Sequence, residues 1–334
     1  MLEVQQRISG PVSRCTVVYQ TKAQWQKTAA IDWGRPMFIK KGVPLILGLL
    51  IFTAQAREGE THQLNFAGTE RSYKLFVPDN AAKAPLPLII VMHGGLGNAD
   101  ETERTTGMNR VAQSNGFLVA YPNGTGMRLM PNRRTWNAGK CCGPAVEDNV
   151  DDVGFIQAML ADVARHHVLD HSRIYATGIS NGAMMAYRLA CELPQDIAAI
   201  VPVSGTLALN SCPGASRIAV LHIHGSNDSN VPYQGGMGEN AIAGVQHRSV
   251  PETLQMIANA HGCNTPPSGQ ALPDGSELTS WNCQGKAPLQ LRLVPGGEHV
   301  WPGGDSRRNR KLFGGNFSAS QAAWDFASQF KINN

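Results

Sequence analysis

Short apolar segments, separated by loops rich in glycine, proline and polar residues, recur from about residue 70 to the end of the chain. Seven of them have the length and composition of strands: residues 71–77, 86–92, 117–121, 173–177, 198–203, 219–225 and 289–295. Apolar residues at helical spacing mark one helix that begins at Asp152 and two more at residues 183–190 and 318–330. This alternation predicts an α/β fold with a mostly parallel sheet and helices on both faces.

Two of the strands indicate where in the sheet they lie. Residues 86–92 are almost uninterruptedly apolar, as in a parallel strand that is covered on both faces. Residues 71–77 alternate between polar and apolar and are expected at an edge. Because no repeat, linker or second core interrupts the pattern, residues 57–334 are predicted to form one catalytic domain.

The sequence Gly-Ile-Ser-Asn-Gly at residues 178–182 lies between a predicted strand and a predicted helix. Glycines on both sides of Ser180 permit the sharp strand-to-helix turn that presents a serine as a nucleophile. The pattern alone also arises by chance in a glycine-rich chain, so its interpretation depends on partner residues. The α/β-hydrolase fold requires an acid and then a histidine downstream of such a serine.

Both partners occur in the required order, each in a loop that follows a predicted strand. Asp228 follows the strand at 219–225, and His299 follows the strand at 289–295. Ser180, Asp228 and His299 therefore lie at one edge of the predicted sheet, where α/β folds place their sites. Three alternatives stay open: Asp228 could brace a turn, His299 could be a solvated loop residue, and the neighbouring Glu298 could be the acid.

Acyl transfer also needs hydrogen-bond donors for the developing oxyanion. The strand at 86–92 ends in His-Gly-Gly-Leu-Gly, a turn of small residues whose backbone N–H groups can face a site. We assign the oxyanion donors to the backbone N–H groups of Gly95 and Asn181. The alternative is a plain glycine-rich loop.

Other polar residues are given structural roles. His222 and His224 lie within an apolar strand and are expected to be packed and hydrogen-bonded rather than catalytic. Asp151 and Asp152 could be taken for metal ligands, but a helix cap formed by Asp152 is preferred. No zinc or phosphate-binding motif is present, so neither a metal nor a cofactor is expected.

At this point the chain resembles the secreted polyhydroxybutyrate depolymerase and feruloyl esterase group of α/β-hydrolases, over about residues 60 to 332. The resemblance is carried by five segments together: residues 93–95, 136–143, 150–155, 178–182 and 299–304. It implies the triad Ser180, Asp228 and His299, and a substrate-binding role for Trp301. Asn181 departs from the pattern, because polymer-degrading members often have a smaller residue there.

The beginning of the chain is interpreted as an export signal. Residues 37–56 combine a basic start, an apolar run and the small-residue sequence Ala-Gln-Ala before Arg57, as in a signal peptide. Residues 1–36 then form a spurious upstream extension. A signal anchor is the alternative, but the apolar run is short for a bilayer span, and no stable membrane anchor is expected after cleavage.

Removal of residues 1–56 changes the charge and the cysteine count. The whole chain has a net charge of +4, but residues 57–334 carry 22 basic and 23 acidic residues, which gives no argument for nucleic-acid binding. Six of the seven cysteines remain, an even number that favours disulfides in an exported protein. We predict a Cys263–Cys283 disulfide and leave the pairing of the other four open.

The predicted function is that of a secreted serine esterase, extracellular or periplasmic, that acts on a small or oligomeric ester. Hydroxyalkanoate esters are slightly preferred and a feruloyl or related carbohydrate esterase is the alternative; a serine peptidase or a non-catalytic binding protein is less favoured. Trp301, Tyr233 and Trp136 are the expected walls of an apolar acyl pocket. Only 35 residues follow His299, so soluble esters are expected to be preferred over solid polymer.

Overall fold

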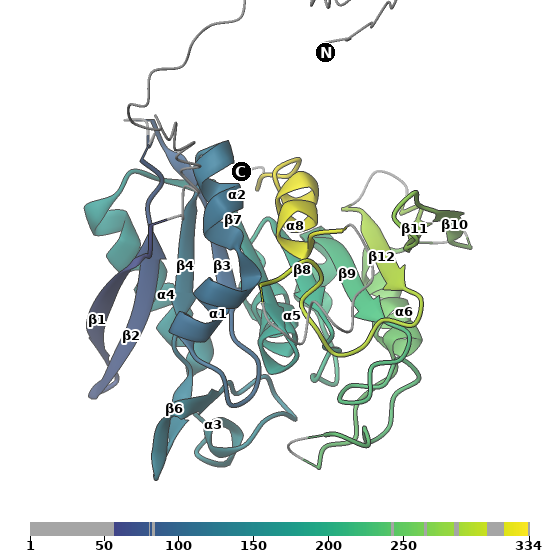
Figure 1. The fold of residues 1–334 in the computed structure, drawn as a ribbon, viewed down its shortest axis with the longest axis horizontal. Helices are drawn as coiled ribbons and strands as arrows, with labels where there is room; N and C mark the ends of the chain where they lie inside the picture. The colour runs from purple at the N-terminus through teal and green to yellow at the C-terminus, as the bar shows by residue number, and fades with distance from the viewer. Residues whose placement is uncertain are drawn as a thin grey trace, which may run out of the picture. The chain divides into compact units, whose positions relative to one another are not determined.

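The computed structural model describes residues 57–79, 81, 84–241, 244–263, 266–283, 287–305 and 317–332. The predicted signal peptide and the segment before it lie outside these residues. Within them the chain forms a central sheet with helices on both faces (Figure 1), which is the predicted fold class. None of the helices in this part of the chain combines the length and hydrophobicity that a bilayer span requires.

The central sheet has ten strands in the order β1-β2-β4-β3-β7-β8-β9-β12-β11-β10. Their bounds are β1 Glu60–Phe66, β2 Thr69–Phe76, β3 Leu86–Met92, β4 Leu118–Pro122, β7 Leu169–Ile179, β8 Ala199–Val203, β9 Ala219–Gly225, β10 Ser268–Ala271, β11 Glu277–Trp281 and β12 Leu289–Val294. From β4 to β12 all neighbours are parallel, and the outer strands are antiparallel. A separate hairpin pairs β5 (Thr125–Met127) with β6 (Met130–Thr135).

Helices cover the two faces of the sheet. The first group, α1 (Ala99–Thr106), α2 (Met108–Asn115) and α8 (Ala319–Ala327), lies on one face, and α4 (Asp152–His166), α5 (Asn181–Glu192) and α6 (Val250–His261) lie on the other (Figure 1). Short helical turns are α3 (Pro144–Glu147) and the 3₁₀ segment η1 (Pro213–Arg217). Two apolar cores result, one under each group, so the parallel strands are buried on both sides as expected from residues 86–92.

The structure corrects two details. Residues 71–77 do not form an edge strand, because β2 lies between β1 and β4. The edge is β1, whose side chains are exposed or only partly buried. Asp152 is not the helix cap: the Asp151 side chain accepts the hydrogen bond from Gly154 N, one residue earlier.

Three disulfides connect the six cysteines of the described chain. Cys263 pairs with Cys283, which confirms the prediction. The pairs left open are Cys191 with Cys212 and the adjacent residues Cys141 with Cys142. The Cys191–Cys212 bridge ties the end of α5 to η1.

Candidate active site

Ser180 lies in the turn between β7 and α5. Its φ of 58° and ψ of −122° are unusual for a residue with a side chain. The turn is tight, because a Cβ at Gly178 would lie 2.7 Å from the carbonyl carbon of Gly182, and one at Gly182 would lie 2.4 Å from the Met92 oxygen. The glycines flanking Ser180 are therefore required by contact with the neighbouring strand and helix, and the serine side chain is left partly exposed.

Asp228 and His299 lie side by side. His299 Nδ1 is 2.8 Å from Asp228 Oδ2, and the other carboxylate oxygen accepts hydrogen bonds from the backbone N–H groups of Asn230 and Val231. Burial raises the pKa of Asp228, but the hydrogen bond and charge of His299 outweigh it, so this pKa lies below its ordinary value. The partner of the histidine is thus Asp228 and not Glu298.

Within the described residues, no hydrogen bond joins the hydroxyl of Ser180 to His299. The Nε2 atom of His299 is left for such a bond, because Nδ1 is taken by Asp228. Catalytic hydrogen bonds of this kind often tighten only when substrate is bound.

A chain of buried side chains leads to Asp228 from behind. Tyr187 Oη is 2.8 Å from His222 Nδ1, His222 Nε2 is 3.0 Å from His224 Nδ1, and His224 Nε2 is 2.9 Å from the Val231 carbonyl. Burial lowers the pKa of both histidines, so both rings are neutral. Because a carbonyl can only accept, His224 carries its proton on Nε2, and its Nδ1 then accepts from His222 Nε2. His224 Nε2 also lies 3.5 Å from Asp228 Oδ2, so the chain ends at the carboxylate that faces His299. The two rings are packed and hydrogen-bonded, as predicted.

The loop after β3 is fixed through His93. Its Nε2 accepts from Gly124 N at 3.0 Å, which places the ring proton on Nδ1, 2.8 Å from the Gly94 carbonyl. Burial lowers the pKa of His93 to about 4, so the ring is neutral. The turn that follows is closed by a 3.0 Å bond from Gly97 N to Gly94 O, and it carries Gly95 into the site.

Asn181 begins α5, and its side chain also has a structural role. Its side chain is buried and pairs with the backbone of Trp136, accepting from the N–H at 2.7 Å and donating to the carbonyl at 3.1 Å. The segment that follows carries Cys141 and Cys142 to the wall of a cavity beside Ser180. The asparagine therefore anchors part of that wall, which accounts for a larger residue at this position.

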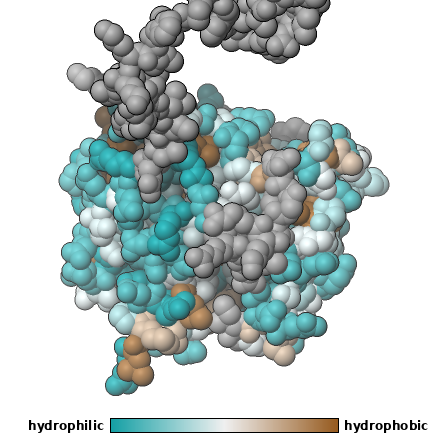
Figure 2. Space-filling model, viewed as in Figure 1, coloured by the Kyte–Doolittle hydropathy of each residue, from teal (hydrophilic) through white to brown (hydrophobic). Residues whose placement is uncertain are grey.

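The larger cavity at Ser180 has a volume of about 690 Å³. Its lining includes Ser180, Asn181 and Gly95. Met184, one turn after Ser180 along α5, also lines it. The β5–β6 hairpin contributes further apolar side chains, Met127 and Met130. In Figure 2 apolar surface is visible at the lower end of the molecule, where Figure 1 places β6 and where Leu129 and Met130 are exposed.

A smaller cavity of about 240 Å³ lies on the other side of the loop after β3. His299 lines this cavity, and Gly95, Leu96 and Arg133 line both cavities. Its remaining wall comes largely from the threonine-rich helix α1. The candidate catalytic groups thus lie between two cavities of different character.

The expected aromatic walls are placed differently. Trp136 has no exposed surface and donates its indole N–H to the His93 carbonyl, so it is a core residue. Tyr233 packs edge-on against His224. Neither Trp136 nor Tyr233 lines either of the two cavities. Trp301 lines the smaller cavity, although it is only 3% exposed. The larger cavity instead has three methionines in its lining, Met127, Met130 and Met184. The sequence gives a positional signal only for Met184, one helical turn after Ser180.

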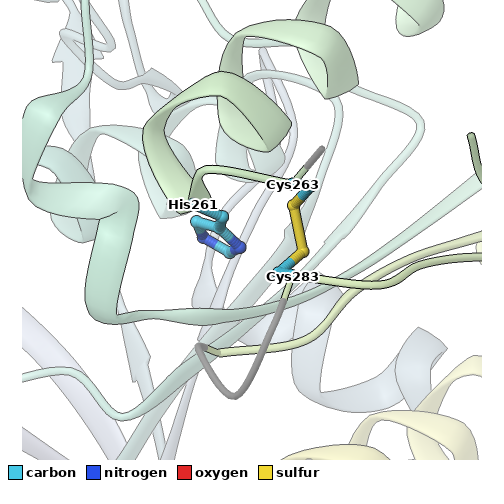
Figure 3. A group of neighbouring side chains, drawn as sticks. All are labelled: His261, Cys263 and Cys283. Carbon is cyan, nitrogen blue, oxygen red and sulfur yellow. A yellow bond between two sulfur atoms is a disulfide. The ribbon is translucent and has the colours of Figure 1, made fainter. Parts of the chain in front are cut away.

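One group of potential metal ligands lies close together among the residues that the structure describes. The donor atoms of His261, Cys263 and Cys283 are within 4.8 Å of one another (Figure 3). The two sulfurs are bonded to each other, and a disulfide offers no thiolate to a metal. His261 Nε2 also contacts the Ala215 carbonyl at 2.7 Å, so the cluster has a structural role.

The chain is similar to several known esterases. The family described as esterase PHB depolymerase matches residues 71–257. An inferred esterase of Nocardia uniformis subsp. tsuyamanensis is 31% identical over 258 residues, which cover 71% of this chain and 72% of that protein. Feruloyl esterase B of Piromyces equi is 28% identical over 264 residues, covering 77% of this chain; the match spans only 44% of that longer protein. The acetyl xylan esterase from Aspergillus awamori shares the fold, with a TM-score of 0.56 at 18% identity, covering 76% of this chain and 97% of that one.

Proposed function

The chain belongs to the esterase PHB depolymerase family and is a carboxylic ester hydrolase, and we propose that it cleaves esters of bulky aromatic acids of the feruloyl type. The observation that carries this proposal is the larger cavity at Ser180. Its volume of about 690 Å³ lies in the range that holds a drug-sized ligand, much more than an acetyl group fills. Met127, Met130 and Met184 give it the polarizable apolar walls that suit an aromatic ring.

The relatives favour the same choice. The description of the family names PHB depolymerase, which fits the first preference from the sequence, hydroxyalkanoate esters, but several similar proteins are named for other esters. Feruloyl esterase B is named for feruloyl esters, and further similar proteins have the same kind of name, such as feruloyl esterase C of Emericella nidulans. We therefore place feruloyl-type esters first and hydroxybutyrate oligomers second.

The proposed reaction follows the acyl-enzyme scheme of serine hydrolases. His299 Nε2 takes the proton of the Ser180 hydroxyl while Oγ forms a bond to the ester carbonyl carbon, and the backbone N–H groups of Asn181 and Gly95 bind the oxyanion. The bond from carbon to the alcohol oxygen then breaks, and the imidazolium gives its proton to that oxygen. Water repeats the sequence to release the acid. Asp228 holds the imidazole and stabilises its charged form.

A panel of soluble esters tests the proposal. Methyl ferulate, p-nitrophenyl acetate and a hydroxybutyrate oligomer would be compared at equal enzyme concentration, with S180A as the matched inactive variant. We expect the highest kcat/KM for methyl ferulate and loss of all three activities in S180A, without loss of its circular dichroism spectrum. Hydrolysis of the hydroxybutyrate oligomer alone would overturn the substrate, and a fully active S180A would overturn the nucleophile.

Export is proposed from the disulfides and the signal-like segment together. Three disulfides are expected in an oxidising compartment and are rare in the cytosol. Residues 57–334 would then be the mature catalytic domain. N-terminal sequencing of exported protein should give Arg57 as the first residue; a first residue at Met1 or Met37 would contradict this.

A further inference from the structure

We propose that Trp136 is a positioning residue for ester hydrolysis: it holds together the two segments that carry the oxyanion donors, Gly95 and Asn181. The inference rests on the proposed hydrolysis by Ser180, with these two backbone N–H groups as its oxyanion donors. Trp136 has no exposed surface and lines neither of the two cavities beside the site. It therefore acts through the residues that it contacts and not on the substrate.

The two donors lie side by side on separate segments. Gly95 follows β3 and Asn181 begins α5, and a Cβ built at Gly95 would lie 3.9 Å from the Asn181 Cβ. Pairing between β3 and β7 ends at Met92 and Gly178, so it stops before either donor. Both N–H groups must lie about 2.7 to 3.1 Å from one oxygen to stabilise it, so their separation needs a restraint of its own.

Trp136 holds Asn181 through its backbone. The Asn181 side chain accepts from the Trp136 N–H at 2.7 Å and donates to the Trp136 carbonyl at 3.1 Å, and both residues are buried. Two hydrogen bonds between the same pair of groups fix the direction of the side-chain amide as well as its distance. Because this side chain and the donor N–H belong to one residue, the pair also restrains the first turn of α5.

The indole of Trp136 holds the other segment. Its Nε1–H donates to the His93 carbonyl at 3.0 Å, and its ring packs against the His93 ring with the centroids 4.8 Å apart. His93 Nδ1 in turn donates at 2.8 Å to the carbonyl of Gly94, the residue directly before Gly95. One buried residue is thus bonded to both sides of the proposed oxyanion hole.

Trp136 is itself fixed in place. Its carbonyl also accepts from Cys142 N at 2.9 Å, so its backbone N–H, its carbonyl and its indole N–H are all paired. Two residues earlier, Arg134 O accepts from Leu96 N at 2.7 Å, and Arg134 N donates to the Gly97 carbonyl at 3.2 Å. These backbone bonds remain when the indole is changed, so loss of its N–H should shift the donors rather than unfold the site.

The test removes the indole N–H and keeps an aromatic ring. W136F should lower kcat about tenfold, less than the roughly 100-fold or greater loss of a whole oxyanion donor, with little change in KM. The loss should be the same on methyl ferulate and on p-nitrophenyl acetate, because both esters form the same oxyanion. W324F is the matched control: Trp324 lies on α8 with its ring stacked on Phe117 and lines neither cavity, so this variant should keep the kcat of wild type.

A transition-state analogue separates positioning from a general packing defect. With a phenylboronic acid, Ser180 Oγ forms a bond to boron, its proton goes to His299, and a boron-bound oxygen takes the oxyanion position. Free ferulate occupies the cavity without this bond. W136F should weaken binding of the boronic acid about tenfold and leave binding of ferulate unchanged; equal weakening of both would overturn the proposal.

A double variant tests whether Trp136 and Asn181 act as one unit. N181A should lower kcat as W136F does, and W136F/N181A should lose less than the product of the two single losses, because either change uncouples the segments. Multiplicative losses, or equal kcat in W136F and W324F, would contradict the proposal. If W136F does not fold, the two ligands decide the question with N181A. Absence of ester hydrolysis in wild type would overturn the proposed function itself, and this inference with it.

Discussion

Ser180 is held in a backbone conformation that glycine would adopt more readily. Its positive φ is a local cost of about 1 to 3 kcal/mol that the surrounding structure imposes. The proposed nucleophile therefore lies at a position that lowers the stability of the fold.

This cost can be measured with two inactive variants. S180G should be about 1 kcal/mol more stable toward urea than S180A, because glycine accepts the left-handed region without a Cβ penalty. Neither variant should cleave an ester. An S180G protein that unfolds at lower urea concentration than S180A, with the same denaturant slope, would contradict the assignment of strain to this residue.

The buried histidine chain has a consequence for Asp228. Removing the donor to the Val231 carbonyl in H224L should lower kcat about tenfold with little change in KM, because the backbone N–H of Val231 then holds Asp228 less firmly in line with His299. H224Q keeps a donor and should recover part of the rate. Y187F, which removes the hydroxyl at the far end of the chain, is the control and should lose much less. Equal losses in all three would indicate a general packing defect instead.

Neutral His93 makes stability depend on pH. The folded pKa of about 4 lies below the unfolded value of about 6.5, so the unfolded chain takes up the proton first as the pH falls. Stability from this group is therefore complete above pH 6.5 and is lost progressively toward pH 4, by on the order of 3 kcal/mol. The difference in unfolding free energy between wild type and H93Q should shrink by this amount from pH 7 to 4. A constant difference would refute the interpretation.

At the scale of elements, the β5–β6 hairpin has one side chain that lines the larger cavity beside another that faces solvent. Met130 lines the larger cavity, whereas Leu129 at the tip is 89% exposed and is not among its lining residues. M130A should lower kcat/KM for methyl ferulate several-fold, by the loss of apolar contact with the ring, and should affect p-nitrophenyl acetate much less. L129A is the matched control. Equal effects of M130A on both esters would place the hairpin outside acyl recognition.

Most of the elements that carry the site could be predicted, because each has apolar residues in a strand or helix pattern and ends in a turn. The strands β3, β7, β9 and β12 and the helix α5 are of this kind. The helix α1 was not predicted, since residues 99–106 have no apolar stripe. The edge strand β1 was not predicted for the same reason. Without β1, the sequence placed β2 at the edge of the sheet.

The candidate site also has a part that could be predicted from the sequence and a part that could not. Ser180, Asp228 and His299 follow predicted strands, and parallel strands bring such loops to one edge. The cavity walls depend instead on how loops fold over that edge. Residue type did not distinguish Trp136, a core residue that donates to a backbone carbonyl, from a cavity wall. Nothing in the local sequence indicates that Met127 and Met130 lie near Ser180.

For the whole molecule, one buried hydroxyl joins three distant parts of the chain. Ser320 on α8 accepts from Trp301 and donates to Thr106, and both bonds are buried. S320A leaves the indole N–H and the carbonyl without this partner, so the free energy of unfolding should fall by about 1 to 3 kcal/mol. S328A, at the other end of α8, is the control. A change of less than about 0.5 kcal/mol in S320A would contradict this role.

The hydrogen bond between Ser320 on α8 and Trp301 in the loop of His299 has a consequence for protein synthesis. The ribosome adds Ser180 first, then Asp228 and His299, and only afterwards α8, whose Ser320 binds Trp301 in the loop of His299. A nascent chain therefore carries all three proposed catalytic groups before it carries the helix that fixes the loop of the last of them. We expect a nascent chain that ends before residue 320 to have no esterase activity.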